Sequence, residues 1–344
     1  FGLTGLGGGV GSNLVGGGEP YVGYLAVAHE DSPFISVYPW DEGFGTKYSD
    51  PSTLPSNSGR DVAFSPDGAD IAVGSYSNPF GAYEFIHVWA WSSSGFGTKY
   101  SDPSSLFHGN AEGVTFSPDG ADIAITNGSS EPPYINVYPW SSGFGTKYAD
   151  PSTLPGGSGG DSVAFSPDGA DLAVASWGTP YITVYPWSSG FGTKYADPST
   201  LPAGQANDVA FSPDGANIAV AHVSSPYITA YPWSSGFGTK YADPSTLPAG
   251  NAEGVAFSPN GADIAVAHNT TPFISVYEWS SGFGTKYSDP STLPTSTTTG
   301  VAFSPDGANI AVSIYSSPRI HVYPWSSGFG TKYSDPSTLP AGSG

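Results

Sequence analysis

The 344-residue chain contains no cysteine and no methionine. Without cysteine it can form neither a disulfide framework nor a thiolate-based metal or redox site. The sequence has no run of about 18 apolar residues, so it offers no membrane span. It starts at Phe1 without a basic, apolar leader. We therefore expect that a signal or pro-segment has been removed, and that the protein is extracellular or lies on a cell surface or a virion.

Basic residues are also scarce. Nine Lys and Arg face 29 Asp and Glu, which gives a formal net charge of −20, although only 11% of residues are charged. Binding of nucleic acid or of an anionic membrane surface requires clustered cations. The composition therefore argues against both as partners.

The chain is rich in turn-forming and aromatic residues, with 47 Gly, 33 Pro and 14% aromatics. This profile is typical of many short strands joined by tight turns. A segment of the form Val-Ala-Phe-Ser-Pro-Asp-Gly, followed by an apolar strand, recurs along the sequence. Equivalent apolar positions are Leu25, Ile71, Ile123, Leu172, Ile218, Ile264 and Ile310. Seven units of about 46 residues therefore cover almost the whole chain.

Each unit contains four strand signals, as in residues 209–211, 217–221, 227–231 and 237–241. The Ser-Pro-Asp-Gly segment between the first two strands is typical of a tight turn, because Pro fixes φ, the Asp side chain hydrogen-bonds to the nearby backbone and Gly adopts a positive φ. Four antiparallel strands repeated radially make a propeller blade. The sequence predicts an all-β, seven-bladed β-propeller over residues 13–344. We expect residues 1–12, a Gly-rich N-terminal arm, to dock on another subunit of a larger assembly.

Several recurring residues are interpreted as structural. The Trp that follows Tyr-Pro in most units is expected to wedge between blades. The Asp of the Ser-Pro-Asp-Gly turn is replaced by Asn260 in the sixth unit, which suits a turn residue better than a metal ligand. Histidines at equivalent strand ends are interpreted as polar strand-end residues; they are His29, His222 and His268.

The Phe-Ser-Pro-Asp-Gly phrase followed by an apolar strand resembles the repeat of YVTN-type and WD-like β-propellers, in six of seven units. This repeat pattern is also similar to that of uncharacterised propellers from bacteriophage structural genes and bacterial surface proteins. This resemblance implies a binding scaffold. Some YVTN-like relatives are lactonases, but the resemblance identifies no catalytic residue in this chain.

Loop variation among the seven units points to one face of the ring. Loops after the first and third strands hardly vary, whereas loops after the second strand and between blades do. Divergent loops can specify a partner, so we expect contacts on the variable face. The alternative is that these are only longer hairpins. Exposed aromatics with polar neighbours suit a contact surface; the candidates are Tyr76, Phe80, Tyr83, Trp177, Tyr315 and Arg319.

Carboxylates precede the innermost strand in five units and are expected to converge at the mouth of the central channel. They are Asp61, Glu112, Asp161, Asp208 and Glu253. One hypothesis is an acidic ring that attracts a cation such as calcium or a basic peptide, and the alternative is a merely solvated ring. We predict no resident metal site and no cofactor. Asn127 and Asn269 begin glycosylation sequons.

The sequence contains no nucleophile elbow, phosphate loop or paired-histidine motif. We therefore predict a non-enzymatic structural or adhesive propeller on a virion or cell surface, with protein subunits of a multi-copy assembly as partners through residues 1–12. The alternatives are a lectin-like propeller that binds surface glycans and a lactonase-like hydrolase. No catalytic residue is predicted.

Overall fold

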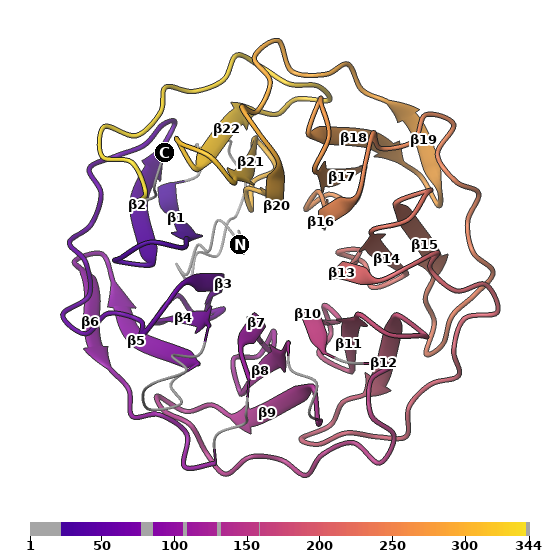
Figure 1. The fold of residues 1–344 in the computed structure, drawn as a ribbon, viewed down its shortest axis with the longest axis horizontal. Coiled ribbons are helices and arrows are strands. Elements are labelled where there is room, and N and C mark those ends of the chain that lie inside the picture. Colours follow the sequence, from indigo (N-terminus) through magenta and orange to yellow (C-terminus); the bar gives the residue numbers. More distant parts are fainter. Residues whose placement is uncertain (1–21, 77–84, 106–108, 129–131, 158, 342–344) are drawn as a thin grey trace, which may run out of the picture.

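The computed structural model describes residues 22–76, 85–105, 109–128, 132–157 and 159–341. Seven separate antiparallel sheets are arranged radially around a central channel, as the sequence predicts (Figure 1). The fold is therefore an all-β, seven-bladed propeller. The expected arm at residues 1–12 lies outside the described part of the chain, as does the innermost strand expected near residues 15–21. Within the described ranges, no helix has the length and apolar character needed to cross a membrane.

The strands follow one another from the channel outward in each blade. Blades 1 to 3 comprise β1 (Val22–Ala28) and β2 (Ile35–Asp41); β3 (Gly59–Phe64), β4 (Asp70–Ser75), β5 (Ile86–Ser92) and β6 (Gly95–Lys99); and β7 (Ala111–Phe116), β8 (Asp122–Asn127) and β9 (Ile135–Pro139). Blades 4 and 5 comprise β10 (Gly160–Phe165), β11 (Asp171–Ser176) and β12 (Ile182–Pro186); and β13 (Ala206–Phe211), β14 (Asn217–His222) and β15 (Ile228–Pro232). Blades 6 and 7 comprise β16 (Ala252–Phe257), β17 (Asp263–His268), β18 (Ile274–Trp279) and β19 (Phe283–Lys286); and β20 (Thr298–Phe303), β21 (Asn309–Ile314) and β22 (Ile320–Pro324).

The Ser-Pro-Asp-Gly turns join the first two strands of a blade, as expected. In blade 5 the Asp214 carboxylate accepts bonds from the Ser212 hydroxyl, at 2.5 Å, and from the backbone of Ala216, at 3.0 Å. Gly215 has a φ of 70°. Asn260 makes the equivalent bonds in blade 6, which confirms that the turn needs an acceptor and not a charge.

Among the residues that the structure describes, a complete fourth strand forms only in blades 2 and 6, so the expectation of four strands in every blade is too regular. In blades 1, 3, 4, 5 and 7 the outer segment makes a single bridge between a Trp and a Phe, such as Trp233 and Phe237. Those five blades have Pro before the Trp, whereas blades 2 and 6 have Ala90 and Glu278. Proline has no N–H to offer to a strand ladder, which explains the shortened pairing.

At four of the described junctions, neighbouring blades are joined by hydrogen bonds to a buried Asp at the start of the second strand. Asp171 of blade 4 accepts the indole N–H of Trp233 from blade 5 at 2.8 Å, and the hydroxyl of Tyr195 at 2.9 Å. Equivalent indole bonds reach Asp70, Asp122 and Asp263. Trp233 is 6% exposed. The recurring Trp is thus an inter-blade wedge, as predicted, and it also makes a specific bond.

Blade 7 packs directly against blade 1 and so closes the ring (Figure 1). Val322 and Ile320 of β22 share one apolar cluster with Leu25 and Val27 of β1. The Tyr38 hydroxyl donates to the Thr338 carbonyl at 2.7 Å, across 300 positions of sequence. Closure therefore depends on packing and hydrogen bonds between neighbouring blades.

Replacement of the junction carboxylate should weaken the ring. Asp171→Ala leaves the buried indole N–H of Trp233 and the half-buried hydroxyl of Tyr195 without their acceptor. We expect a loss of about 2 to 4 kcal/mol in the free energy of unfolding. Asp171→Asn keeps an acceptor and should cost much less, because Asn217 occupies the same place in blade 5 and accepts from Tyr241. Thermal melting of the two variants checks this, and equal losses would contradict it.

Candidate functional site

A β-bulge near the start of the innermost strand shapes the channel mouth. In blades 2 to 7 the register with the second strand shifts after the first residue of the innermost strand. A bulge re-aims side chains and often lies beside functional sites. The residues at the bulge position are Arg60, Glu112, Asp161, Asn207, Glu253 and Thr299. The next residues, at what we call the clamp position, are Asp61, Gly113, Ser162, Asp208, Gly254 and Gly300.

The five predicted carboxylates all line the central cavity, but they do not form one equivalent ring. Glu112, Asp161 and Glu253 occupy the bulge position, and Asp61 and Asp208 the clamp position one residue later. They also lie within the innermost strands and not before them. The single acidic ring of the sequence analysis is thus two layers with different hydrogen bonding.

The clamp-position carboxylates tie neighbouring blades together. Asp61 accepts the backbone N–H groups of Val62 in its own blade, at 2.9 Å, and of Val114 in blade 3, at 2.8 Å. Asp208 does the same with Val209 and Val255, both at 2.8 Å. Burial raises the pKa of Asp61 and of Asp208 to about 6, although these N–H bonds favour the charged form. Their arrangement is that of structural clamps.

Asp161 lies in a different environment, beside an ion pair. Arg60 donates from Nε to Glu112 at 2.7 Å, and its guanidinium carbon lies 4.6 Å from the centre of the Tyr76 ring. Burial and the nearby charge of Glu112 raise the pKa of Asp161 to about 7, against the opposing effects of Arg60 and of Trp177. A carboxyl group that titrates near neutral pH can accept and return a proton.

The opposite side of the mouth is neutral or acidic. Asn207 donates from its amide to Glu253 at 3.1 Å and to the Ala252 carbonyl at 2.9 Å. Burial raises the pKa of Glu253 above its ordinary value. The hydroxyl of Ser162 donates to Asp208 at 2.6 Å, which links blade 4 to blade 5.

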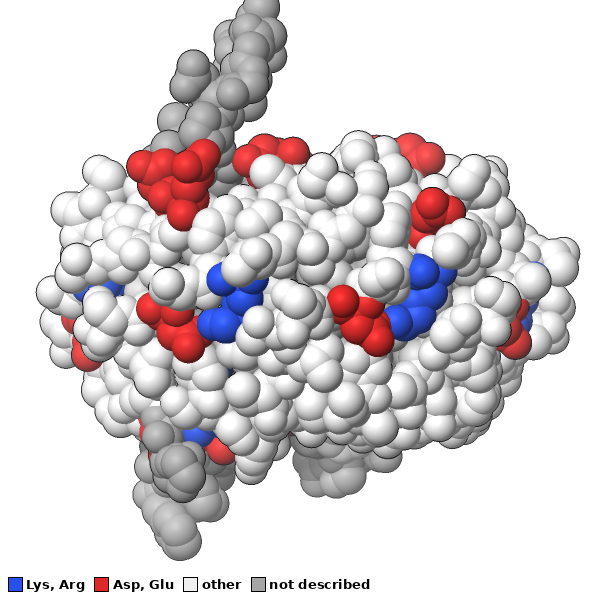
Figure 2. All heavy atoms as spheres, turned by 90° about the horizontal axis from the view of Figure 1, so that it is seen from above, with Lys and Arg blue, Asp and Glu red and all other residues white. Residues whose placement is uncertain are grey.

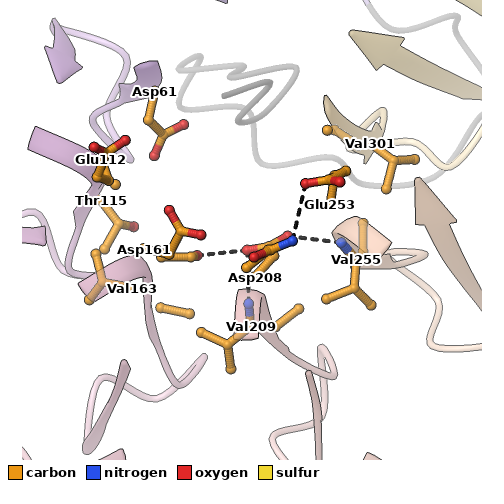
Figure 3. A pocket seen from close by; sticks show the side chains of 18 of the residues that line it. Asp61, Glu112, Thr115, Asp161, Val163, Asp208, Val209, Glu253, Val255 and Val301 are labelled. Atoms are coloured by element: carbon orange, nitrogen blue, oxygen red, sulfur yellow. Dashed lines mark hydrogen bonds between the residues drawn. The ribbon is translucent and has the colours of Figure 1, made fainter. Parts of the chain in front are cut away.

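These side chains enclose a cavity of about 630 Å³ along the channel (Figure 3). The carboxyl groups of Asp61, Asp161 and Asp208 point into it, and small or apolar residues such as Val209 form its deeper wall. A cavity of this size accommodates a small molecule. Arg60 is the one cationic side chain among the described residues that line it.

The lysines lie elsewhere, on the outer side of the disc. Every lysine pairs with an Asp three residues further along the chain, as Lys240 does with Asp243, and Figure 2 shows blue and red neighbours along this side. The cavity electrostatics therefore depend on its own carboxylates and on Arg60.

The candidate residues of the variable face fall into two groups. Tyr76 and Trp177 border the channel mouth, where they contact Arg60 and affect Asp161. Tyr315, 52% exposed, lies near Arg319, whose guanidinium carbon is 6.0 Å from the Tyr315 ring centre. Arg319 also lies 4.0 Å from Asp31 of blade 1. Phe80 and Tyr83 are outside the described residues.

The strand-end histidines belong to the blade interior. His222 is fully buried and its Nε2 bonds to the Thr229 hydroxyl at 2.9 Å; burial lowers its pKa to about 4. His29 and His268 bond in the same way to Ser36 and Ser275. Across the described ranges, no three His, Asp or Glu side chains gather closely enough to hold a metal ion.

The two sequon asparagines differ in burial. Asn127 is 1% exposed and lies at the end of β8, so its side chain is inaccessible in the folded chain. Asn269 is half-buried in the loop that follows β17.

No protein-family model matches the sequence, and no curated protein matches it. Solved structures do. A periplasmic gluconolactonase from Pseudomonas aeruginosa has a TM-score of 0.66 at 18% identity, over 92% of this chain and 98% of that one. Candidate 6-phosphogluconolactonases from Bacteroides uniformis and Bacteroides fragilis give TM-scores of 0.64 and 0.67 at 14% and 16% identity. They cover 90% and 88% of this chain, and 93% and 90% of their own. The chain has the fold of the lactonase propellers.

This likeness corrects two predictions. The non-enzymatic structural or adhesive module is wrong, because the structures that share the fold over about nine tenths of this chain carry lactonase names. The prediction that the chain is not an enzyme is wrong for the same reason. Both rested on the lack of a nucleophile elbow, a phosphate loop or a paired-histidine motif in the sequence. The bulges instead bring Asp161 and Arg60, which occur at this position in one blade each, to the same cavity.

The raised pKa of Asp161 makes a prediction about stability. A carboxyl whose folded-state pKa lies above its ordinary value stabilises the fold when protonated, and that contribution is lost as pH rises through about 7. Asp161→Asn should therefore raise the free energy of unfolding at pH 8 by about 1 to 3 kcal/mol, after allowance for partial solvent contact. At pH 4 it should change little. Urea unfolding at both pH values measures the difference.

The matched control is Asp168→Asn in the same blade. Hydrogen bonds from Ser166 and Ala170 lower the pKa of Asp168, so its contribution has the opposite sign: present at pH 8 and lost in acid. This variant should be less stable than the parent at pH 8. A gain in stability from both substitutions would refute the assignment of the buried charge to Asp161.

Proposed function

We propose that the protein hydrolyses small, uncharged cyclic esters of the lactone type in its channel cavity. The observation that carries the proposal is the pairing of Asp161, whose pKa is raised to about 7, with the cation Arg60 in the wall of one cavity. The shared fold of the lactonases supports it, since their names state this chemistry.

Ester hydrolysis needs a base for the attacking water and a positive charge for the oxyanion. The Asp161 carboxylate takes a proton from water as the water oxygen bonds to the carbonyl carbon. Arg60 stabilises the developing negative charge, and its ion pair with Glu112 and its stacking on Tyr76 fix its position. The ring C–O bond then breaks, and Asp161 returns the proton to the departing oxygen, which gives a hydroxy acid.

The charge of the cavity favours an uncharged substrate. Five carboxyl groups and one guanidinium line it, so a phosphorylated lactone is repelled in the low-dielectric channel. The carboxylate product is repelled for the same reason, which assists its release. This selectivity separates the proposed activity from that of a 6-phosphogluconolactonase.

Hydrolysis of D-glucono-1,5-lactone tests the proposal, followed by proton release with the spontaneous rate subtracted. We expect kcat/KM for this lactone to exceed that for its 6-phosphate by at least about tenfold, as charge repulsion of more than 1.4 kcal/mol requires. The rate should rise with pH to a plateau above about 7, because Asp161 acts in its charged form.

Variants assign the roles. Asp161→Asn should reduce kcat by about 10² to 10³, the usual contribution of a general base, and should abolish the rise with pH. Arg60→Met should reduce kcat by about 10². Asp168→Asn, outside the cavity, should retain the parental rate. Absence of turnover by the parent protein, or full activity of Asp161→Asn, would refute the proposal.

We also propose that the protein acts outside the cytoplasm. A chain without cysteine is indifferent to an oxidising compartment, and the Pseudomonas aeruginosa structure with the same fold is periplasmic. Fractionation of the producing cells checks this: the protein should appear in the envelope or medium fraction, and recovery in the cytosol alone would contradict it.

A further inference from the structure

Beside each bulge lies what we call the rim position, the residue whose backbone N–H bonds to the residue two places before the bulge. These residues are Tyr76, Gly128, Trp177, Val223, Asn269 and Tyr315. Each rim residue lies next to the bulge residue of its own blade. Tyr76 stacks on Arg60, and Gly128 leaves room for Glu112, since a Cβ there would lie 2.6 Å from the Glu112 side chain. Trp177 is the largest rim residue, and its bulge residue is Asp161.

The chain of blade 4 is adapted to hold Trp177. The loop before β10 has four glycines over residues 156–160, whereas the corresponding loops of blades 2, 3, 5, 6 and 7 have at most one, such as Gly204 or Gly250. Gly157 and Gly178 approach so closely that a Cβ on either would lie 2.1 Å from the other's Cα. Gly159 has a φ of +112°, and a Cβ on it would lie 3.0 Å from the Trp177 ring. Glycine is required at these close approaches.

The indole nitrogen of Trp177 is buried and makes no hydrogen bond of normal geometry with the described residues. In blades 2 and 3 the rim position lies against the bulge side chain, and the same backbone pairing, from the Trp177 N–H to the Gly159 carbonyl, places Trp177 beside Asp161. Trp177 there favours the charged form of the Asp161 carboxyl and so lowers its pKa. The other charged groups around Asp161 come from neighbouring blades. Glu112 opposes its ionisation and Arg60 favours it.

We propose that Trp177 is a positioning residue for Asp161: its ring shields the carboxyl from water, and its indole N–H holds the carboxylate at the channel mouth. The two parts act in opposite directions. Shielding disfavours the charged form of the carboxyl, whereas an N–H donor favours it. Together they set the pH at which Asp161 exchanges its proton. The effect on catalysis rests on the proposed lactone hydrolysis, but the effect on Asp161 does not.

Carbon-13 NMR of protein labelled at the Asp carboxyl carbons measures the titration of Asp161 directly, and the signal missing from Asp161→Asn identifies it. Trp177→Phe keeps a ring and removes the N–H, so the pKa of Asp161 should rise by about 0.5 to 1 unit. Trp177→Val introduces the residue that blade 5 carries at this position. It admits water, and the pKa should fall toward the ordinary value near 4 by about 1 unit or more.

The matched control is Tyr315→Val at the rim of blade 7, beside the uncharged Thr299, and it should leave the titration of Asp161 unchanged. If Trp177→Val does not fold, Gly159→Ala displaces the ring and should lower the pKa in the same way. Shifts of the two Trp177 variants in one direction, no shift, or an equal shift from Tyr315→Val would overturn the proposal. These titrations do not require turnover, so failure of the lactonase proposal remains distinguishable. With turnover, the pH midpoint of kcat should move in parallel.

Discussion

The packing of a recurring Trp between neighbouring blades is the constraint on which the ring depends, and at four of the described junctions the indole N–H of this Trp also bonds to a buried carboxylate. The bonds of Trp140 to Asp70 and of Trp233 to Asp171 show the pattern, and aromatic neighbours such as Tyr195 complete it. A closed ring requires every junction to have the same wedge angle, so residues at the junctions cannot vary independently. The near identity of the outer three quarters of the units follows from closure.

What can vary is the start of each innermost strand, where the side chains line the channel and several of them also bond to the next blade. In blades 2 to 7, the blades whose innermost strands the structure describes, the bulge gives two such positions and the rim gives a third. Seven copies of a symmetric unit can therefore present different side chains to one cavity. Arg60, Asp161 and Asn207 come from three blades, and each meets the others only because the ring closes.

Much of this could be predicted from the sequence. The period of about 46 residues, the Ser-Pro-Asp-Gly turns and the recurring Trp indicate a propeller, and the channel carboxylates can be located because repeated units align. The division into two layers could not be predicted, because a bulge shifts register without a signal in one sequence. The loss of the fourth strand does have a signal, the Pro before Trp233 and its equivalents, and Ala90 and Glu278 mark the exceptions. The interpretation of the channel mouth as an acidic ring left out Arg60. Its signal in the sequence is a single cation at a repeat position that is acidic or polar in the other units.

The acidity of the cavity bears on the proposed reaction as well as on the charge of the substrate that the cavity favours. Clamp carboxylates such as Asp61 and Asp208 hold the blades together, yet burial keeps their pKa near 6, so they add negative charge to the channel at neutral pH. That charge raises the proton affinity of any further carboxyl in the cavity. The pKa of Asp161 is raised mainly by burial and by the charge of Glu112, and Arg60 limits the rise, so that the group still ionises near neutral pH. In the proposed reaction a neutral ester enters this cavity without an electrostatic penalty and leaves it as an anion, so the negative field of the cavity favours release of the product.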